Sequence, residues 1–192
     1  MKVENGKKKL FVSIIFFCSL LIYSQPKRII TLDGAITETV VDLGFEKQIV
    51  AVDVTSEHSD NIKKLPKVSK NRSISAEGLM AFRPDIIIAP YGDVPHGVIQ
   101  ALKGAGIKFV AIKQEYSVKG ALQFIRDVSV ALGVKEKGTK LAFDTEKRIN
   151  KALQTVKLNL KKPIVLFIYA RGTGTMTVAG KGSNMDAMIT LA

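Results

Sequence analysis

Four short apolar runs, separated by segments of helical character, constrain the fold of this chain more than any other feature. The runs are rich in Ile and Val, and they cover residues 28–32, 49–52, 85–89 and 108–112. Continuous apolar runs of this length are typical of strands that are covered on both faces. Because strands that alternate with helices pair in parallel through right-handed crossovers, the sequence predicts an α/β fold with a parallel sheet.

The three helices predicted between these runs each stop at a glycine or just before a proline, as helices commonly do. They span residues 35–43, 75–82 and 94–103. Ligands of open parallel sheets gather at the carboxyl ends of the strands. A binding site is therefore expected in the loops after Leu32, Val52, Ala89 and Ile112.

A long polar helix is predicted after this first lobe. An amphipathic segment at 118–132 ends at Gly133, and residues 139–160 then continue with helical character, rich in Lys and Glu. A long helix with only a narrow apolar seam is suited to bridging two domains. We expect an α/β lobe at residues 25–133 and an interlobe helix within residues 134–162.

The remaining residues, 163–192, predict the start of a second α/β lobe. A strand is expected at 164–169, a second strand at 176–179 after a glycine-rich turn, and a helix from Ser183 or Asn184. About 30 residues are too few to form a hydrophobic core alone. We therefore expect the second lobe to be incomplete in this sequence.

The amino end has the pattern of a secretory signal peptide. Three lysines, Lys7 to Lys9, precede an apolar run at 10–23 that gives way to Ser24. This run is shorter than the roughly 20 residues that a membrane-spanning helix needs. We expect cleavage near residue 24 and export of the mature chain. A lipid anchor at Cys18 is not expected, because Phe17 stands where a small residue is required.

Charge and cysteine content exclude several classes of function. The chain carries 29 Lys and Arg against 17 Asp and Glu, which favours an anionic partner or surface. The lysines are scattered rather than clustered with aromatic residues, so nucleic-acid binding is not expected. The single cysteine excludes an internal disulfide, and no Cys/His cluster has zinc spacing.

Motifs of common enzymes are also missing. The first predicted strand-to-helix loop holds only Gly34 of the glycines that a dinucleotide fingerprint requires. The two histidines, His58 and His96, are not accompanied by a Gly-x-Ser-x-Gly elbow. A non-catalytic protein is therefore predicted, with an exported α/β enzyme as the alternative from a different class.

Four ordered motifs resemble a family of exported proteins. They read PKRIITLDGAITETVVDLG at 26–44, SISAEGLMAFRPDIIIAP at 73–90, ALKGAGIKFVAI at 101–112 and TVAGKGSNMDAMITLA at 177–192. Together they resemble the periplasmic substrate-binding proteins of ABC importers for haem, cobalamin and iron-siderophores, and most of all the haemin-binding subgroup. The resemblance implies two Rossmann-like lobes joined by one long helix, the arrangement called class III, with the ligand held between them.

This resemblance also implies a function and its partners. The protein would be a monomer that captures haem as a transported ligand, needs no catalytic cofactor and delivers haem to the permease subunits of an ABC importer. Cobalamin or a ferric siderophore is the alternative ligand. Residues expected to contact the ligand are Asp33, Gly34, Lys70, Arg72, Tyr91, Tyr169 and Arg171.

One loop departs from the pattern of the haem-binding subgroup. Arg72 matches the arginine expected near a propionate, but Lys70 and Ser69 replace the usual tyrosine and glycine. Iron ligation is therefore open among three side chains, Tyr169, Tyr91 and His96.

Glu77 matches a glutamate that, by the resemblance, docks onto the permease. From the residues alone, its carboxylate could instead complete a capping box with Ser75 or favour the helix N-terminal dipole.

Overall fold

The computed structural model describes residues 25–68, 73–155, 163–172 and 174–191. Four parallel strands form its main sheet: β1 (Ile29–Thr31), β2 (Ile49–Val52), β3 (Ile86–Pro90) and β4 (Lys108–Ile112). Their order in the sheet is β2-β1-β3-β4. All three pairings are parallel, which confirms the α/β prediction for the first lobe.

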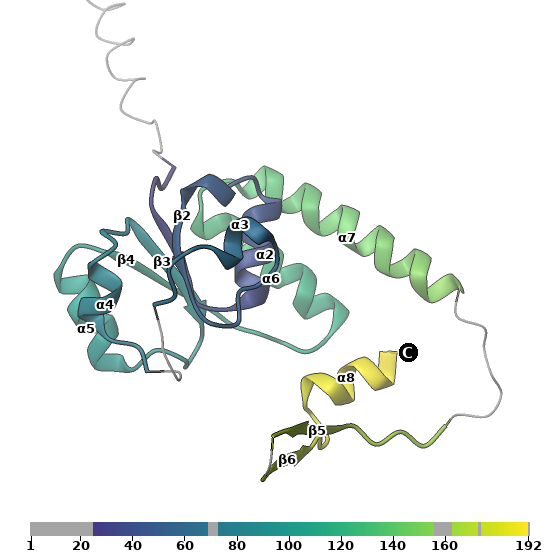
Figure 1. Ribbon diagram of the computed structural model, residues 1–192. Coiled ribbons are helices and arrows are strands. Elements are labelled where there is room, and N and C mark those ends of the chain that lie inside the picture. The colour runs from purple at the N-terminus through teal and green to yellow at the C-terminus, as the bar shows by residue number, and fades with distance from the viewer. Residues whose placement is uncertain (1–24, 69–72, 156–162, 173, 192) are drawn as a thin grey trace, which may run out of the picture.

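Helices cover both faces of this sheet (Figure 1). Side chains of β1 and β3 alternate between two apolar clusters: Ile29 and Ile86 face one, whereas Ile30 and Ile87 face the other. The first cluster includes residues of α2 (Gly34–Asp42) and α6 (Val118–Ala131), and the second includes residues of α4 (Ala76–Met80) and α5 (His96–Gly104). This two-sided burial explains why the strands are apolar throughout.

The structure contains two short elements that the sequence did not predict. The 3-10 helix η2 (Glu46–Gln48) precedes β2, and α3 (Asp60–Lys63) follows it. Ser59 caps α3 by accepting a hydrogen bond from the backbone N–H of Ile62 at 3.3 Å. Elements of three or four residues have too few positions to show an apolar period, so periodicity cannot identify them.

The long helix α7 (Lys135–Thr155) begins four residues before the predicted start at position 139 and includes Gly138. A Cβ at Gly138 would overlap the Ser129 side chain of α6, so glycine lets the two helices approach closely at this point. Residues 156–162, where the predicted helix ends, lie outside the described residues.

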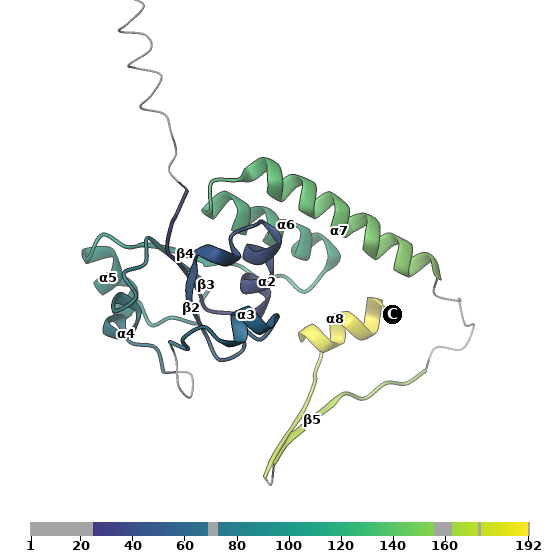
Figure 2. The same ribbon diagram turned by 45° about the horizontal axis from the view of Figure 1, so that its top comes forward.

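The carboxyl end holds an antiparallel hairpin, β5 (Ile168–Arg171) and β6 (Thr175–Val178), followed by α8 (Asn184–Leu191). The strand predicted at 164–169 begins only at Ile168, and residues 163–167 have no helix or strand assignment. In Figures 1 and 2 the hairpin projects away from the main sheet, with α8 between it and α7. In the described part of the chain, every buried apolar side chain lies between Ile29 and Ala142.

None of the helices in the described residues is both long and apolar enough to cross a membrane.

Candidate functional site

The carboxyl ends of β1, β2, β3 and β4 lie along one edge of the main sheet, because the four strands are parallel. We call this the carboxyl edge. The polar residues Asp33, Asp53, Tyr91 and Lys113 follow the four strands within two positions of their ends. The edge is where an open α/β sheet holds its ligand.

Asp33 and Gly34, two predicted ligand contacts, form the junction between β1 and α2. Asp33 is the N-cap of α2, and its Oδ1 accepts hydrogen bonds from the N–H groups of Ala35 at 2.9 Å and Ile36 at 3.1 Å. A Cβ at Gly34 would lie 3.2 Å from the carbonyl oxygen of Thr55. Gly34 therefore lets the loop after β2 pack closely on the start of α2.

A network of buried hydroxyl groups joins the ends of β1 and β2. The Oγ1 atom of Thr37 lies 2.7 Å from Oγ1 of Thr31 and 2.7 Å from Oγ of Ser56. Ser56 in turn donates to Oδ1 of Asp53 at 2.6 Å, and the Thr55 hydroxyl donates to Oδ2 at 2.6 Å. This network fixes the loop after β2 against the first helix. Asp53 and Ser56 are residues that sequence reasoning did not identify.

The Asp33 carboxylate, which follows β1, is influenced by carboxylates in the loops after β2 and β3. Partial burial raises the pKa of Asp33 above its ordinary value, and the negative charges of Asp53 and Asp93 raise it further. The N–H donors of Ile36 and Ala35 oppose this increase. The surroundings of Asp33 are thus unfavourable for an anion.

Tyr91 lies at the end of β3 and is 70% exposed. Its backbone N–H donates to the carbonyl oxygen of Ile112 at 2.8 Å, so it continues the pairing of β3 with β4. The Lys113 ammonium lies 5.8 Å from the centroid of the Tyr91 ring. His96, the first residue of α5, is exposed, and its Nε2 lies 3.2 Å from Nε2 of Gln100.

Two predicted contacts, Lys70 and Arg72, lie outside the described residues, as does Ser69. Glu77 is exposed in the first turn of α4. Ser75 caps this helix by accepting a hydrogen bond from Gly78 at 3.1 Å, so the third helical position belongs to Gly78 rather than to Glu77. A capping box formed by Ser75 and Glu77 is therefore not present.

Tyr169 and Arg171 both belong to β5, where Tyr169 pairs with Thr177 and Arg171 with Thr175. The Tyr169 side chain is 51% exposed. Nothing further is described of the Arg171 side chain. In Figures 1 and 2 their hairpin lies apart from the carboxyl edge, so the structure does not bring Tyr169 together with Asp33 or Tyr91.

A cavity of about 820 Å³ lies between the loop after β4, the long helix α7 and the carboxyl-terminal helix α8. Its lining combines apolar side chains such as Val118, Ile149, Met188 and Leu191 and the aromatic ring of Tyr116 with polar groups that include Asn184 and the carboxylates of Glu115 and Asp186. None of the predicted site residues that the structure describes lines this cavity. From the sequence, the cavity could have been located only through the expectation that the loop after Ile112 belongs to the binding site.

The loop that lines this cavity is held by local contacts. The Ser117 hydroxyl donates to Oε1 of Glu115 at 2.8 Å and accepts from the Gly120 N–H at 2.9 Å as the N-cap of α6. A Cβ at Gly120 would overlap the carbonyl group of Glu115. Gly120 therefore permits the tight fold of this loop over the first turn of α6.

A smaller cavity, of about 450 Å³, lies at the opposite edge of the sheet. Its lining includes Lys27, Asp85 and Lys108, which lie at or just before the first residues of β1, β3 and β4. The Asp85 carboxylate is already hydrogen-bonded within the chain, because its Oδ2 accepts from the N–H groups of Lys27 at 2.7 Å and Arg28 at 3.0 Å. These contacts anchor the start of β1, away from the carboxyl edge.

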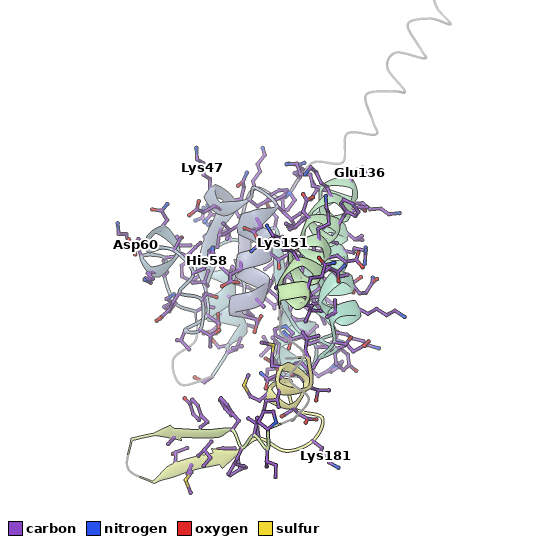
Figure 3. The ribbon with its side chains drawn as sticks, turned by 90° about the vertical axis from the view of Figure 1, so that its right-hand side faces the viewer. Lys47, His58, Asp60, Glu136, Lys151 and Lys181 are labelled. Carbon is purple, nitrogen blue, oxygen red and sulfur yellow. The ribbon has the colours of Figure 1, made fainter. Side chains whose placement is uncertain are left out.

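Basic residues of the described part of the chain lie on several separate elements. Figure 3 shows Lys47, Lys151 and Lys181 on separate elements: η2, α7 and the turn before α8. The His58 imidazole lies 3.2 Å from the carboxylate of Glu38. Among the described residues, no group of three or more His, Cys, Asp or Glu side chains could hold a metal ion.

Several known proteins are similar to this chain. The solved structure of the periplasmic haem-binding protein RhuT of Roseiflexus sp. RS-1 is 32% identical, with a TM-score of 0.81 over 86% of this chain and 63% of that one. The haem-binding protein HutB of Vibrio cholerae is 33% identical, with a TM-score of 0.75 over 85% and 63% of the two chains. The vitamin B12-binding protein of Vibrio parahaemolyticus is 29% identical over 87% of this chain and 60% of its own length.

This chain thus spans about 60–63% of the length of these relatives. The relatives are binding proteins rather than enzymes, as the sequence predicts. The periplasmic binding protein family matches residues 29–192, which include both the main sheet and the carboxyl-terminal segment. The chain therefore belongs to the periplasmic binding protein family.

Proposed function

We propose that this chain is the exported substrate-binding component of an ABC importer and that it captures haem between its lobe and its carboxyl-terminal segment. The cavity at the β4–α6 loop is the observation that carries this proposal. Its volume of about 820 Å³ is within the range of sites for cofactor-sized ligands. Its apolar side chains and the Tyr116 ring suit a large macrocycle.

Haem is favoured over the other ligands of the class by the solved structures. RhuT and HutB are both named as haem-binding and are 32% and 33% identical to this chain. The vitamin B12-binding relative, at 29% identity, makes cobalamin the second candidate. In either case the ligand is a transported substrate, and no catalytic step is required.

Four side chains are candidates for the iron ligand. The sequence proposes Tyr91, Tyr169 and His96, and the structure adds Tyr116, which lines the cavity and is 53% exposed. A phenolate is a hard anionic ligand that suits ferric iron. Replacing the true ligand by Phe should remove the charge-transfer band of a phenolate-bound ferric haem, whereas Phe at the other tyrosines should leave that band unchanged.

Glu77 is proposed to dock onto the permease. Its exposed position in the first turn of α4 leaves the carboxylate accessible to a basic partner. Glu77→Gln should then lower ligand-stimulated ATP hydrolysis by the reconstituted importer without altering haem affinity. Equal stimulation by both proteins would contradict the docking role.

Export to the periplasm is proposed from the signal pattern at residues 1–24, with the mature chain acting as a monomer. Amino-terminal sequencing of the secreted chain should give a first residue near position 25. A lipid-modified Cys18 would contradict this part of the proposal.

Haemin titration of the purified mature chain tests the ligand directly. Binding should produce a saturable change in the Soret band at one haem-to-protein ratio. Cobalamin, followed by fluorescence quenching, serves as the comparison ligand. Binding of cobalamin without any Soret change would replace haem by the second candidate, and binding of neither ligand would overturn the proposal.

A further inference from the structure

Tyr91 and Lys113 form a pair that the fold does not need. The ammonium lies 5.8 Å from the ring centroid, yet 70% of the Tyr91 side chain is exposed and Lys113 is also exposed. A cation–π contact at such an exposed position contributes only about 0.5–1 kcal/mol to stability. A large aromatic ring kept in solvent at the ligand edge of an α/β sheet is better placed for binding than for packing.

The backbone holds this pair in place. Tyr91 and Lys113 directly follow the last paired residues of β3 and β4, Pro90 and Ile112, and the Tyr91 N–H donates to Ile112 at 2.8 Å. The next residue, Gly92, has φ 90°, a left-handed conformation that L side chains rarely adopt. Apart from its two chain neighbours, no heavy atom of the described residues would lie within 4 Å of a Cβ at Gly92, so the space beside this glycine is open.

The pair is also close to the proposed ligand cavity. Glu115, the first lining residue from this loop, lies two positions after Lys113, so their Cα atoms are at most about 7 Å apart. The Glu115 carboxylate is already engaged by the Ser117 hydroxyl at 2.8 Å. A ligand that fills the cavity can therefore reach the Lys113 ammonium with a flexible side group.

Acidic and basic side chains are distributed unevenly along the described carboxyl edge. Asp33, Asp53 and Asp93 lie in the loops after β1, β2 and β3, and the charges of Asp53 and Asp93 help to raise the pKa of Asp33, so a further negative charge is disfavoured near Asp33. Lys113 lies on its β4 side, and no ion pair with an acidic side chain is described for it. An anionic group on a ligand is thus directed toward the end of β4.

We propose that Tyr91 and Lys113 form a recognition site for a planar aromatic ligand that carries a carboxylate. The Tyr91 ring stacks on the flat π-system, which leaves iron ligation to one of the other candidates, and the Lys113 ammonium binds the carboxylate. This inference rests on the proposed haem-binding function and adds a basis for selectivity. Haem carries two propionates, so the pair favours haem over a macrocycle whose side groups are neutral amides.

Haemin and haemin dimethyl ester separate the two roles, because esterification removes the carboxylate charges and retains the planar ring. Lys113→Ala should weaken haemin binding about tenfold, the usual effect of losing one charge-assisted hydrogen bond, and should leave the affinity for the ester unchanged. Lys113→Arg should keep the native preference for haemin. Tyr91→Ala should weaken both ligands by a similar factor.

Lys103→Ala is the matched control, since Lys103 is an exposed lysine in the last turn of α5, at the far end of that helix from the carboxyl edge. Its affinity for haemin should equal that of the native chain. If the native chain binds haemin and Lys113→Ala binds it equally well, or loses affinity for the ester to the same extent, the recognition role is refuted and the haem-binding function stands. If the native chain binds neither haemin nor its ester, both proposals fail.

Discussion

Asp33 is the single residue whose ionisation should change the stability of this lobe most directly. Burial and the charges of Asp53 and Asp93 raise its pKa in the folded state. The folded chain therefore binds this proton more tightly than the unfolded chain. Between the ordinary aspartate pKa of about 4 and the raised folded value, the contribution of Asp33 to the free energy of unfolding decreases as pH rises.

Asp33→Asn tests this linkage, because asparagine retains the oxygen that caps α2 and removes the charge. The variant should gain stability relative to the native chain at pH 7, and the gain should shrink toward pH 3. Urea unfolding of both proteins at the two pH values measures the difference. A difference independent of pH would show that the carboxylate is not destabilised by its surroundings.

Thr37 is expected to be the most sensitive member of the hydroxyl network. Thr37→Val keeps the shape of the side chain but leaves Thr31 and Ser56 without their shared partner. We expect a loss of about 1–3 kcal/mol in the free energy of unfolding. Thr139→Val is the control, since that exposed hydroxyl bonds only to the Lys135 carbonyl of its own helix. Equal effects in urea denaturation would show that the network contributes nothing specific.

At the level of elements, the contact between α6 and α7 depends on Gly138. Alanine there would collide with Ser129, whereas a Cβ at Gly97 of α5 would meet nothing within 4 Å. Gly138→Ala should lower the free energy of unfolding by about 1–3 kcal/mol. Gly97→Ala should leave it unchanged or raise it by up to about 1 kcal/mol, because alanine has the higher helix propensity. Thermal unfolding by circular dichroism distinguishes the two outcomes, and similar midpoints would contradict tight packing at Gly138.

Strands β1, β2 and β3 were predictable because they are buried on both faces and therefore almost entirely apolar, as Ile86 to Ala89 show. The edge strand β4 is only partly buried, but four of its five residues are still apolar. The end of α2 was predictable from Gly44, whereas Gly104, the predicted stop of the later helix, is the last residue of α5, and the left-handed glycine after it is Gly106. The apolar signal fails at residues 164–167, which are equally apolar but exposed and not in a strand. An apolar run predicts a strand only where neighbouring elements cover it.

The candidate site was less predictable than the fold. Motif resemblance selected Asp33 and Tyr91, which the structure places at the carboxyl edge, yet neither lines the larger cavity. Residues of that cavity come from positions as distant in sequence as Tyr116, Ile149 and Met188. Their proximity depends on how α7 and α8 lie relative to the lobe, and a local pattern does not encode this.

For the whole molecule, stability and ligand binding depend on different segments. The buried apolar side chains of the described residues all lie between Ile29 and Ala142, and both core clusters belong to the first lobe. The hairpin and α8 instead expose apolar residues, among them Ile168, Met176 and Met188. Yet more than half of the larger cavity's lining residues come from this same carboxyl-terminal segment.

A chain of residues 25–162 should therefore fold as well as one of residues 25–192 but bind haemin poorly. Its free energy of unfolding should differ by less than about 1 kcal/mol, since regions without buried apolar contacts add little to global stability. Its haemin affinity should fall at least about tenfold, because the ligand loses the wall formed by residues 182–191. Urea unfolding and Soret titration of both chains measure the two quantities separately. If the shorter chain kept its haemin affinity, the ligand would bind at the carboxyl edge rather than in the cavity. Tyr91 and Lys113 would then hold it without contacts from residues 182–191.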